Sequence, residues 1–269
     1  MDYKMIVLDL DGTLTNRDKQ ITPRTREALM EAQKMGKITV LASGRPTQGV
    51  MPLARELELG KYGSYILSYN GGMIINCRTG ETVASALLPP KINRNVIGLA
   101  REYQVNILTY QGDTIITLKK EDPYVELEAR TNQMPVKEIS AMEEYVEFAV
   151  PKFLMVDDGD YLAMVEPRVK AALGKNISVY RSEPFFLEIL PRGIDKAKRL
   201  EALLGILGLS REEVIACGDG YNDLSMIRFA GLGVAMGNAV LPVRNAADYI
   251  TGTNDEDGVA QVVEKFMLS

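Results

Sequence analysis

The feature that most constrains the fold is a repeating unit in which a short, largely apolar run ends in a polar loop and is followed by a helical stretch. Residues 5–8, 38–41 and 214–217 are such runs, and polar or glycine residues follow each of them. A strand with apolar side chains on both faces is buried on both faces, which is typical of a parallel sheet. The alternation of strands and helices therefore predicts an α/β fold with a doubly wound, Rossmann-like parallel sheet.

Helix signals lie between these runs. Thr22 and Pro23 supply an N-cap and a first-turn proline for one helix, and residues 196–207 form a second amphipathic helix. A further buried strand is expected at residues 65–69. These elements extend the alternation toward both ends of the chain.

The regular alternation of strand and helix signals is interrupted in the middle of the chain. Residues 84–186 contain a hairpin signal and short strand signals at 153–156 and 177–180. Short strands mixed with helices in this way indicate an α+β domain. We therefore predict an inserted α+β cap domain at residues 84–186 and a core formed by residues 1–83 and 187–269.

The chain of 269 residues contains no histidine, and this narrows the chemistry. Ser-His-Asp hydrolysis and His-ligated zinc are excluded. Cys77 and Cys217 lack both metal-site spacing and the arginine that follows the nucleophile of a cysteine phosphatase. No Gly-Lys pair is followed by Ser or Thr, so a Walker A loop is also excluded. An enzyme of this composition must use carboxylates.

The charge balance is mildly acidic, with 31 Lys and Arg residues against 36 Asp and Glu residues. No block rich in Lys and Arg suggests binding to nucleic acid or anionic lipid. No uncharged stretch approaches the ~20 apolar residues of a membrane span, and the first residues lack the apolar region of a signal peptide. We expect a cytoplasmic protein that binds a small molecule, with no nucleic-acid or membrane partner.

Four polar groups fall where a predicted strand ends or a helix begins, namely Asp9, Ser43, Lys196 and Asp219. Ligands of open α/β sheets bind outside the carboxyl ends of the strands, so these groups are expected in one site. Asp9 and Asp219 suit Mg²⁺, which prefers oxygen ligands, while Ser43 and Lys196 suit a phosphate dianion. Each residue alone is more often a turn, loop or solvated helix residue. Their order and spacing together favour a site for a phosphoryl group.

In order, the chain carries the motifs Asp9-Leu10-Asp11-Gly12-Thr13-Leu14, then Ser43, then Lys196, then Gly218-Asp219-Gly220-Tyr221-Asn222-Asp223. This set of motifs resembles that of the haloacid dehalogenase superfamily. The long interval between Ser43 and Lys196 is similar to that of the Cof-type sugar-phosphate phosphatases, whose cap is inserted there. The resemblance spans the whole chain and implies a Rossmann-like core with an inserted α+β cap.

The resemblance also implies a role for each matched residue. Asp9 would attack phosphorus to form an aspartyl-phosphate, and Asp11 would protonate the leaving oxygen and then activate water. A general acid must hold a proton near neutral pH, so the Asp11 carboxyl is expected to stay off the metal and to have a pKa above that of a free Asp. Mg²⁺ would be held by Asp9, the backbone carbonyl of Asp11 and Asp219, with Asp223 in support. The phosphate would be bound by Leu10, Ser43, Gly44, Arg45, Lys196 and Asn222.

The sequence thus predicts a Mg²⁺-dependent phosphatase of small phosphorylated metabolites, in particular sugar phosphates. A phosphomutase stays an alternative, because some mutases share this cap type and nucleophile. A phospho-receiver signalling domain is an alternative from another class. The long insertion and Asp11 argue against it, because Asp11 would hasten hydrolysis of a phosphoryl group that signalling has to retain.

Asn70 and Glu188, at the predicted crossings between core and cap, are candidates for substrate selectivity. Every phosphate ester presents the same dianion to the phosphate site, so discrimination must come from other groups. Glu188 is a charge within the apolar run at residues 185–190. It either hydrogen-bonds substrate hydroxyls or turns to solvent, because charged residues are seldom buried unpaired.

Overall fold

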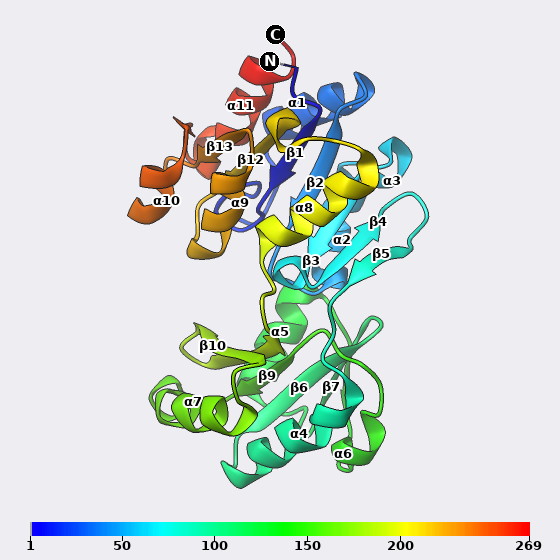
Figure 1. The fold of residues 1–269 in the computed structure, drawn as a ribbon, viewed down its shortest axis with the longest axis vertical. Helices are drawn as coiled ribbons and strands as arrows, with labels where there is room; N and C mark the ends of the chain where they lie inside the picture. The colour runs from blue at the N-terminus through cyan, green and yellow to red at the C-terminus, as the bar shows by residue number, and fades with distance from the viewer. Residues whose placement is uncertain (1) are drawn as a thin grey trace. The chain divides into compact units, whose positions relative to one another are not determined.

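The structure, a computed structural model, describes residues 2–269 and divides the chain into two compact units (Figure 1). The core unit comprises the chain up to Ala84 together with Asp195–Ser269. The cap unit is the continuous insertion Ser85–Ile194. Each unit has an apolar core and a sheet of its own.

The second crossing between the units lies after Ile194 and not after residue 186, where the sequence predicted it. The reason is that β11 (Phe186–Pro191) belongs to the sheet of the cap unit. It pairs antiparallel with both β9 (Phe153–Val156) and β10 (Ile177–Glu183). The apolar run that contains Glu188 is therefore a central strand of the cap sheet.

The core unit is built on an eight-stranded sheet with the order β14-β13-β12-β1-β2-β3-β4-β5. Its central strands are parallel, and Leu8 of β1 lies opposite both Cys217 of β12 and Leu41 of β2. The predicted doubly wound parallel sheet is confirmed, and β4 extends it by pairing antiparallel with β3. The strands are β1 (Met5–Leu8), β2 (Ile38–Ala42), β3 (Tyr65–Ser68), β4 (Met73–Asn76), β5 (Thr82–Ser85), β12 (Val214–Gly218), β13 (Leu232–Ala235) and β14 (Tyr249–Ile250).

Helices pack on both faces of the core sheet, because successive side chains of β1 point to opposite faces. Ile6 and Leu8 join an apolar cluster with residues of α1 and α11, which lie side by side (Figure 1). Met5 and Val7 join a second cluster with Leu200 of α8. The helices are α1 (Pro23–Lys34), α2 (Thr47–Glu56), α3 (Leu59–Tyr62), α8 (Lys196–Leu207), α9 (Leu224–Phe229), α10 (Leu241–Ala246) and α11 (Gly258–Phe266), with short 3₁₀ turns η1 (Tyr69–Gly71), η3 (Arg211–Glu213), η4 (Tyr221–Asp223) and η5 (Asn254–Glu256).

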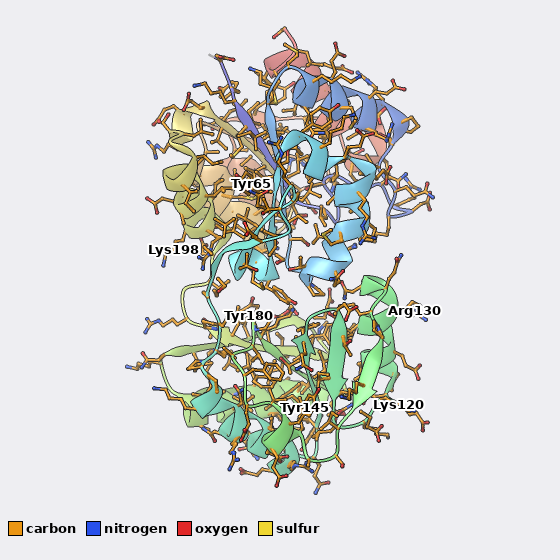
Figure 2. The ribbon with its side chains drawn as sticks, turned by 90° about the vertical axis from the view of Figure 1, so that its right-hand side faces the viewer. Tyr65, Lys120, Arg130, Tyr145, Tyr180 and Lys198 are labelled. Carbon is orange, nitrogen blue, oxygen red and sulfur yellow. The ribbon has the colours of Figure 1, made fainter. Side chains whose placement is uncertain are left out.

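The outer side of α8 carries exposed polar residues, among them Lys198, which is labelled in Figure 2. Its inner side carries Leu200, Leu203 and Leu204, all buried. Across residues 2–269, no helix combines the length and the apolar character that crossing a membrane requires.

The cap unit contains a six-stranded sheet with the order β10-β11-β9-β6-β7-β8. Ile107, Phe153 and Leu187 on one face of this sheet share an apolar cluster with Val96 of α4 and Val165 of α7. The predicted hairpin is formed by β6 and β7. The remaining elements are β6 (Asn106–Gln111), β7 (Thr114–Thr117), β8 (Val136–Glu138), α4 (Asn93–Glu102), α5 (Pro123–Asn132), α6 (Met142–Tyr145), α7 (Gly159–Leu173) and η2 (Pro90–Ile92).

Candidate active site

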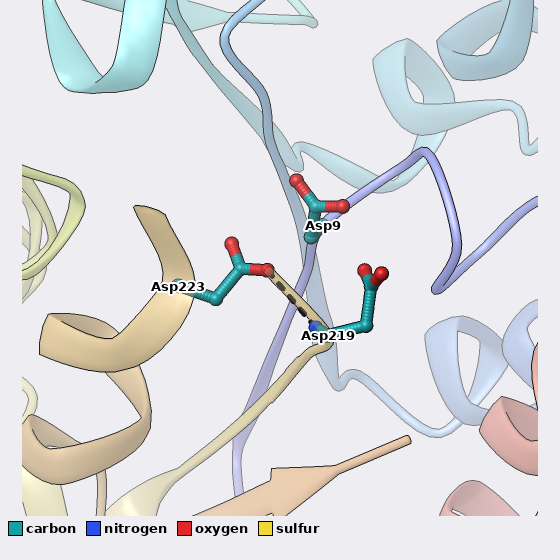
Figure 3. A group of neighbouring side chains, drawn as sticks. All are labelled: Asp9, Asp219 and Asp223. Carbon is teal, nitrogen blue, oxygen red and sulfur yellow. Dashed lines mark hydrogen bonds between the residues drawn. The ribbon is translucent and has the colours of Figure 1, made fainter. Parts of the chain in front are cut away.

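Three acidic side chains, Asp9, Asp219 and Asp223, gather at the carboxyl edge of the core sheet (Figure 3), and the basic side chain of Lys196 contacts Asp9 there. Asp9 follows β1, Asp219 follows β12, Lys196 begins α8 and Asp223 ends η4. The Asp9 backbone N–H donates to the Cys217 carbonyl at 3.1 Å, so the strand pairing fixes where the Asp9 side chain leaves the sheet. The residues Asp9, Lys196 and Asp223 are buried, with exposed fractions of 6%, 1% and 0%.

Lys196 links two of these carboxylates. Its Nζ donates to Asp9 Oδ1 and to Asp223 Oδ1, each at 2.6 Å. The second oxygen of Asp223, Oδ2, accepts from the backbone N–H groups of Asp219 at 3.0 Å and Gly220 at 2.9 Å. Asp223 therefore fixes both the ammonium of Lys196 and the loop that carries Asp219.

The carboxylates carry more negative charge than Lys196 can offset. Burial and the charge of Asp223 raise the pKa of Asp9 to about 8, although Lys196 opposes the shift. Burial likewise raises the pKa of Asp219 to about 6, against a hydrogen bond from Thr13. Burial favours the neutral amine of Lys196, yet Asp223 and Asp9 outweigh it and raise the pKa of that group. The cluster is electrostatically suited to a further cation.

The carboxylate oxygens at this site are suitable ligands for a hard divalent cation. Carboxylate oxygens of Asp9, Asp219 and Asp223 lie within 4.8 Å of one another. Asp9 Oδ1 and Asp219 Oδ1 each accept one hydrogen bond, whereas residues 2–269 provide no hydrogen-bond donor for Oδ2 of either residue. Oxygen ligands from carboxylates are those that Mg²⁺ prefers. Asp9 and Asp219 are thus the best placed side-chain ligands, and the oxygens of Asp223 are already engaged.

The loop after Asp9 packs tightly against Asp219. Gly12 has φ +86°, and a Cβ added there would lie 2.4 Å from Asp219 Oδ2. Thr13 Oγ1 donates to Asp219 Oδ1 at 2.9 Å, and Asn238 Nδ2 donates to the Gly12 carbonyl at 2.8 Å. Thr13 lies within the first sequence motif, but no role was predicted for it. Asn238 lies far along the chain from Gly12, and no role was predicted for it.

Asp11 differs from the expectation for a general acid. Its carboxylate accepts two hydrogen bonds from the Arg45 guanidinium and one from Lys19 Nζ at 2.7 Å. Burial opposes ionisation, but Arg45 and Lys19 outweigh it and hold the pKa of Asp11 below its ordinary value. The expected raised pKa is therefore wrong for this arrangement, because two cations stabilise the charged form. Lys19 had no sequence signal.

Three residues expected to bind phosphate, Ser43, Gly44 and Asn222, contact Asn70. Ser43 is buried, and its Oγ accepts from the Arg45 backbone N–H at 3.2 Å. A Cβ added to Gly44 would lie 3.1 Å from Asn70 Nδ2, so the Asn70 amide packs directly against this glycine. Asn222 Nδ2 donates to Asn70 Oδ1 at 3.2 Å. Asn70 is thus brought into the same site as three residues of the predicted phosphate set.

Leu10, the remaining residue of that set, has a fully buried side chain in the apolar core. Its carbonyl accepts from the backbone N–H groups of Thr13 and Thr15. Only the backbone of Leu10 can therefore contact a ligand.

Glu188 belongs to the cap unit and Asn70 to the core unit. It is not turned to solvent, which contradicts that alternative. Its Oε1 accepts from Lys152 Nζ at 3.0 Å, and both side chains are below 8% exposed, at 7% and 6%. The charge is tolerated in the sheet because it is paired.

The whole chain is similar to known proteins. A family model described as haloacid dehalogenase-like hydrolase matches residues 6–263. The chain is 31% identical over 268 residues to a 5-amino-6-(5-phospho-D-ribitylamino)uracil phosphatase, YcsE, of Bacillus subtilis, covering 100% of this chain and 97% of that protein.

Solved structures give the same result. A haloacid dehalogenase-like hydrolase from Bacteroides thetaiotaomicron has 52% sequence identity and a TM-score of 0.95, covering 98% of this chain and 99% of that one. BT4131, described as a subclass IIB sugar phosphatase, has 25% identity and a TM-score of 0.79, covering 98% of both chains. Sequence motifs, site geometry and both comparisons agree, and the chain belongs to the haloacid dehalogenase-like hydrolase family.

Proposed function

We propose that this hydrolase is a Mg²⁺-dependent phosphatase of small metabolites, in particular sugar phosphates, and that it acts through an aspartyl-phosphate. The observation that carries the proposal is the placement of Asp9, whose buried carboxylate is held by Lys196 beside Asp219. A carboxylate so placed can attack phosphorus while neighbouring cations neutralise the transferring oxygens. A sugar phosphatase and a phosphatase of a ribityl compound among the similar proteins support this substrate class.

Two displacements at phosphorus make up the reaction. In the first, an oxygen of Asp9 bonds to phosphorus while the bond between phosphorus and the ester oxygen breaks. The ester oxygen takes up a proton and leaves as an alcohol. In the second, water attacks phosphorus and gives a proton to the carboxylate of Asp11, the bond to Asp9 breaks, and inorganic phosphate is released. Lys196 Nζ lies 2.6 Å from Asp9 Oδ1, and in this proposal it would donate to the phosphoryl oxygens in both steps.

Mg²⁺ would be held by Asp9 and Asp219 and, when bound, would neutralise negative charge on the phosphoryl group. The protein keeps these ligands in place without it. Thr13 fixes one oxygen of Asp219, and Asp223 fixes the backbone N–H of Asp219. Ser43, the Gly44 backbone N–H and Asn222 are the proposed further donors to phosphate.

Asp11 is the proposed proton donor to the leaving oxygen, and this role requires an exchange of partners. A carboxylate paired with Arg45 and Lys19 holds no proton at neutral pH. A phosphate dianion competes with Asp11 for the Arg45 guanidinium, because guanidinium groups bind phosphate as well as carboxylate. With Arg45 withdrawn, partial burial would oppose ionisation against Lys19 alone of these two cations, so the pKa of the Asp11 carboxyl would rise.

Selectivity among phosphate esters is assigned to residues outside the phosphate site. Glu188, with its partner Lys152, is a candidate because the pair offers both an acceptor and a donor for hydroxyl groups. Loss of a hydrogen bond to a buried substrate group costs about 1–3 kcal/mol, enough to reorder preferences among sugars. Glu188→Gln should therefore change the ranking of sugar phosphates and spare an aryl phosphate.

The proposal is tested by assaying hydrolysis across a panel of phosphorylated sugars, nucleotides and an aryl phosphate, with Mg²⁺ or with excess chelator. We expect release of inorganic phosphate that requires Mg²⁺, with the highest kcat/KM on sugar phosphates. Full activity in chelator would contradict the metal requirement. Turnover that requires an added sugar bisphosphate and yields an isomer would identify a phosphomutase instead.

A further inference from the structure

We propose that Arg199 is a positioning residue, which holds the turn at Tyr69–Gly71 so that the side-chain amide of Asn70 donates to the phosphate of the substrate. The inference rests on the proposed function and adds a donor and its support to the phosphate site. It begins with the backbone of this turn, which follows β3.

Three successive residues of the turn lie in the left-handed region. The φ angles are 54° at Tyr69, 56° at Asn70 and 93° at Gly71. Glycine adopts such angles freely, but residues with a side chain do so at a cost in free energy. Two neighbouring residues of this kind persist only where surrounding contacts determine the conformation, and such places cluster at functional sites.

Contacts from both sides determine this turn. The Tyr69 N–H donates to the Arg45 carbonyl at 3.0 Å, and the Asn70 N–H donates to the Ser43 carbonyl at 2.8 Å. On the other side, Arg199 Nε donates to the Gly71 carbonyl at 2.6 Å. The turn is therefore tied to the loop after β2 by its own N–H groups and to α8 by Arg199.

The turn packs closely against α8. A Cβ added to Gly71 would lie 2.9 Å from Arg199 Cβ and 3.0 Å from the Asp195 carbonyl oxygen. Arg199 follows Lys196 by three residues, so the two side chains share one side of the helix. One helix thereby sets both the ammonium beside Asp9 and the turn that carries Asn70.

The result is an oriented amide. Asn70 Oδ1 accepts from Asn222 Nδ2 at 3.2 Å, so this oxygen is engaged. Residues 2–269 offer no hydrogen-bond acceptor to Asn70 Nδ2, which lies against Gly44. An amide N–H₂ beside the loop of Ser43 and Gly44 is suited to a phosphate oxygen, not to a substrate cation.

The experiment measures the dissociation constant of inorganic phosphate by calorimetry in the presence of Mg²⁺, together with kcat and KM for an aryl phosphate. The variants are Asn70→Ala, Arg199→Met and the double variant. Lys198→Met is the matched control, because Lys198 is exposed on the same helix (Figure 2). Arg199→Lys keeps the charge and offers a donor for the Gly71 carbonyl.

We expect Asn70→Ala and Arg199→Met each to weaken phosphate binding by about tenfold, as for the loss of one hydrogen bond to a charged group. The double variant should bind phosphate no less tightly than the single variant with the larger loss of affinity, because both changes remove the same donor. Arg199→Lys should lie between wild type and Arg199→Met, and Lys198→Met should match wild type. Arg199→Lys combined with Asn70→Ala should likewise bind phosphate no less tightly than Asn70→Ala alone. The role of Arg199 can therefore still be tested if Arg199→Met is unstable.

Additive losses in the double variant, or unchanged phosphate binding when Arg199 is replaced, would overturn the role of Arg199. Unchanged binding in Asn70→Ala would overturn the role of the amide. A wild-type protein that neither binds phosphate nor hydrolyses any ester would instead contradict the proposed function.

Discussion

The guanidinium of Arg45 holds the carboxylate of Asp11 through two hydrogen bonds, from Nε to Oδ2 at 2.8 Å and from Nη2 to Oδ1 at 2.5 Å. Paired hydrogen bonds of this kind are among the strongest that side chains form. The residue proposed as the general acid is thus stored as an anion, two positions from the proposed nucleophile Asp9. Substrate phosphate, by binding Arg45, would remove one of the two cations that pair with Asp11 and so raise the pKa of its carboxyl.

Asp11→Asn should slow esters with poor leaving groups more than activated ones. A sugar alkoxide needs protonation to leave, whereas an aryl oxide needs far less, and general acid catalysis contributes about 10²–10⁴-fold. We expect kcat/KM to fall within that range for a sugar phosphate and by a smaller factor for an aryl phosphate. Equal losses on both substrates would remove Asp11 from this role.

The metal-free protein should lose stability as the pH rises from about 5 to 8. The pKa of Asp9 is raised to about 8 and that of Asp219 to about 6, above the ordinary value of 3.8. The folded state then binds more protons than the unfolded state over this range, so the free energy of unfolding falls with increasing pH.

Urea unfolding at several pH values, in chelator and in Mg²⁺, checks this prediction. Mg²⁺ should remove most of the loss of stability at higher pH, because the ion replaces the protons in neutralising the charges of Asp9 and Asp219. Asp9→Asn should flatten the dependence in chelator. Stability that increased between pH about 5 and 8 without metal would contradict the assigned shifts.

Gly12→Ala should weaken Mg²⁺ binding, and Gly36→Ala is its matched control. Both glycines have nearly the same φ, +86° and +85°, so alanine carries similar backbone strain at each. Only at Gly12 would the new Cβ meet a neighbour, at 2.4 Å from Asp219 Oδ2, whereas nothing lies within 4 Å at Gly36.

We expect Gly36→Ala to lower stability by about 1 kcal/mol and to leave the Mg²⁺ dependence of activity unchanged. Gly12→Ala should raise the Mg²⁺ concentration needed for half-maximal activity. Identical metal dependence in the two variants would show that Asp219 is not displaced.

Breaking the buried pair of the cap unit should be costly, and removing both partners should not. Glu188→Leu leaves the Lys152 ammonium buried and unpaired, which costs about 3–5 kcal/mol. The double variant Lys152→Met, Glu188→Leu should recover most of this loss in urea unfolding.

The exposed pair Arg94 and Glu147 in the same unit provides the control, with both side chains 69% exposed. Glu147→Leu should change stability by less than about 1 kcal/mol. A single variant Glu188→Leu as stable as wild type would contradict the burial of the pair.

The sequence predicted the parts of the fold whose signals are local. β1 and β12 are continuous apolar runs, and their carboxyl ends carry Asp9 and Asp219, so the sequence could assign both residues to the same edge of the sheet. β5 was missed because its four residues are half-buried or exposed and carry no apolar pattern. The second domain crossing was misplaced because the apolar run at residues 185–190 does not by itself show whether its strand joins the core sheet or the cap sheet.

The state of Asp11 could not be predicted, because its partners come from separate segments. Arg45 reaches it from the loop after β2, and Lys19 reaches it from a turn in which Lys19 itself has φ +60°. The strained turn at Asn70 was missed for the same reason. Its conformation depends on Arg199 of α8, which is far along the chain.

The central claim is that Asp9 is the nucleophile, and trapping the phosphoenzyme tests it most directly. Protein mixed with ³²P-labelled substrate and Mg²⁺ is quenched in acid within one turnover and digested. We predict a label that hydroxylamine removes, as expected for an acyl phosphate, on the peptide containing Asp9, and no label on the folded Asp9→Asn variant. A label on another residue, or phosphate release by Asp9→Asn at a rate near wild type, would contradict the account.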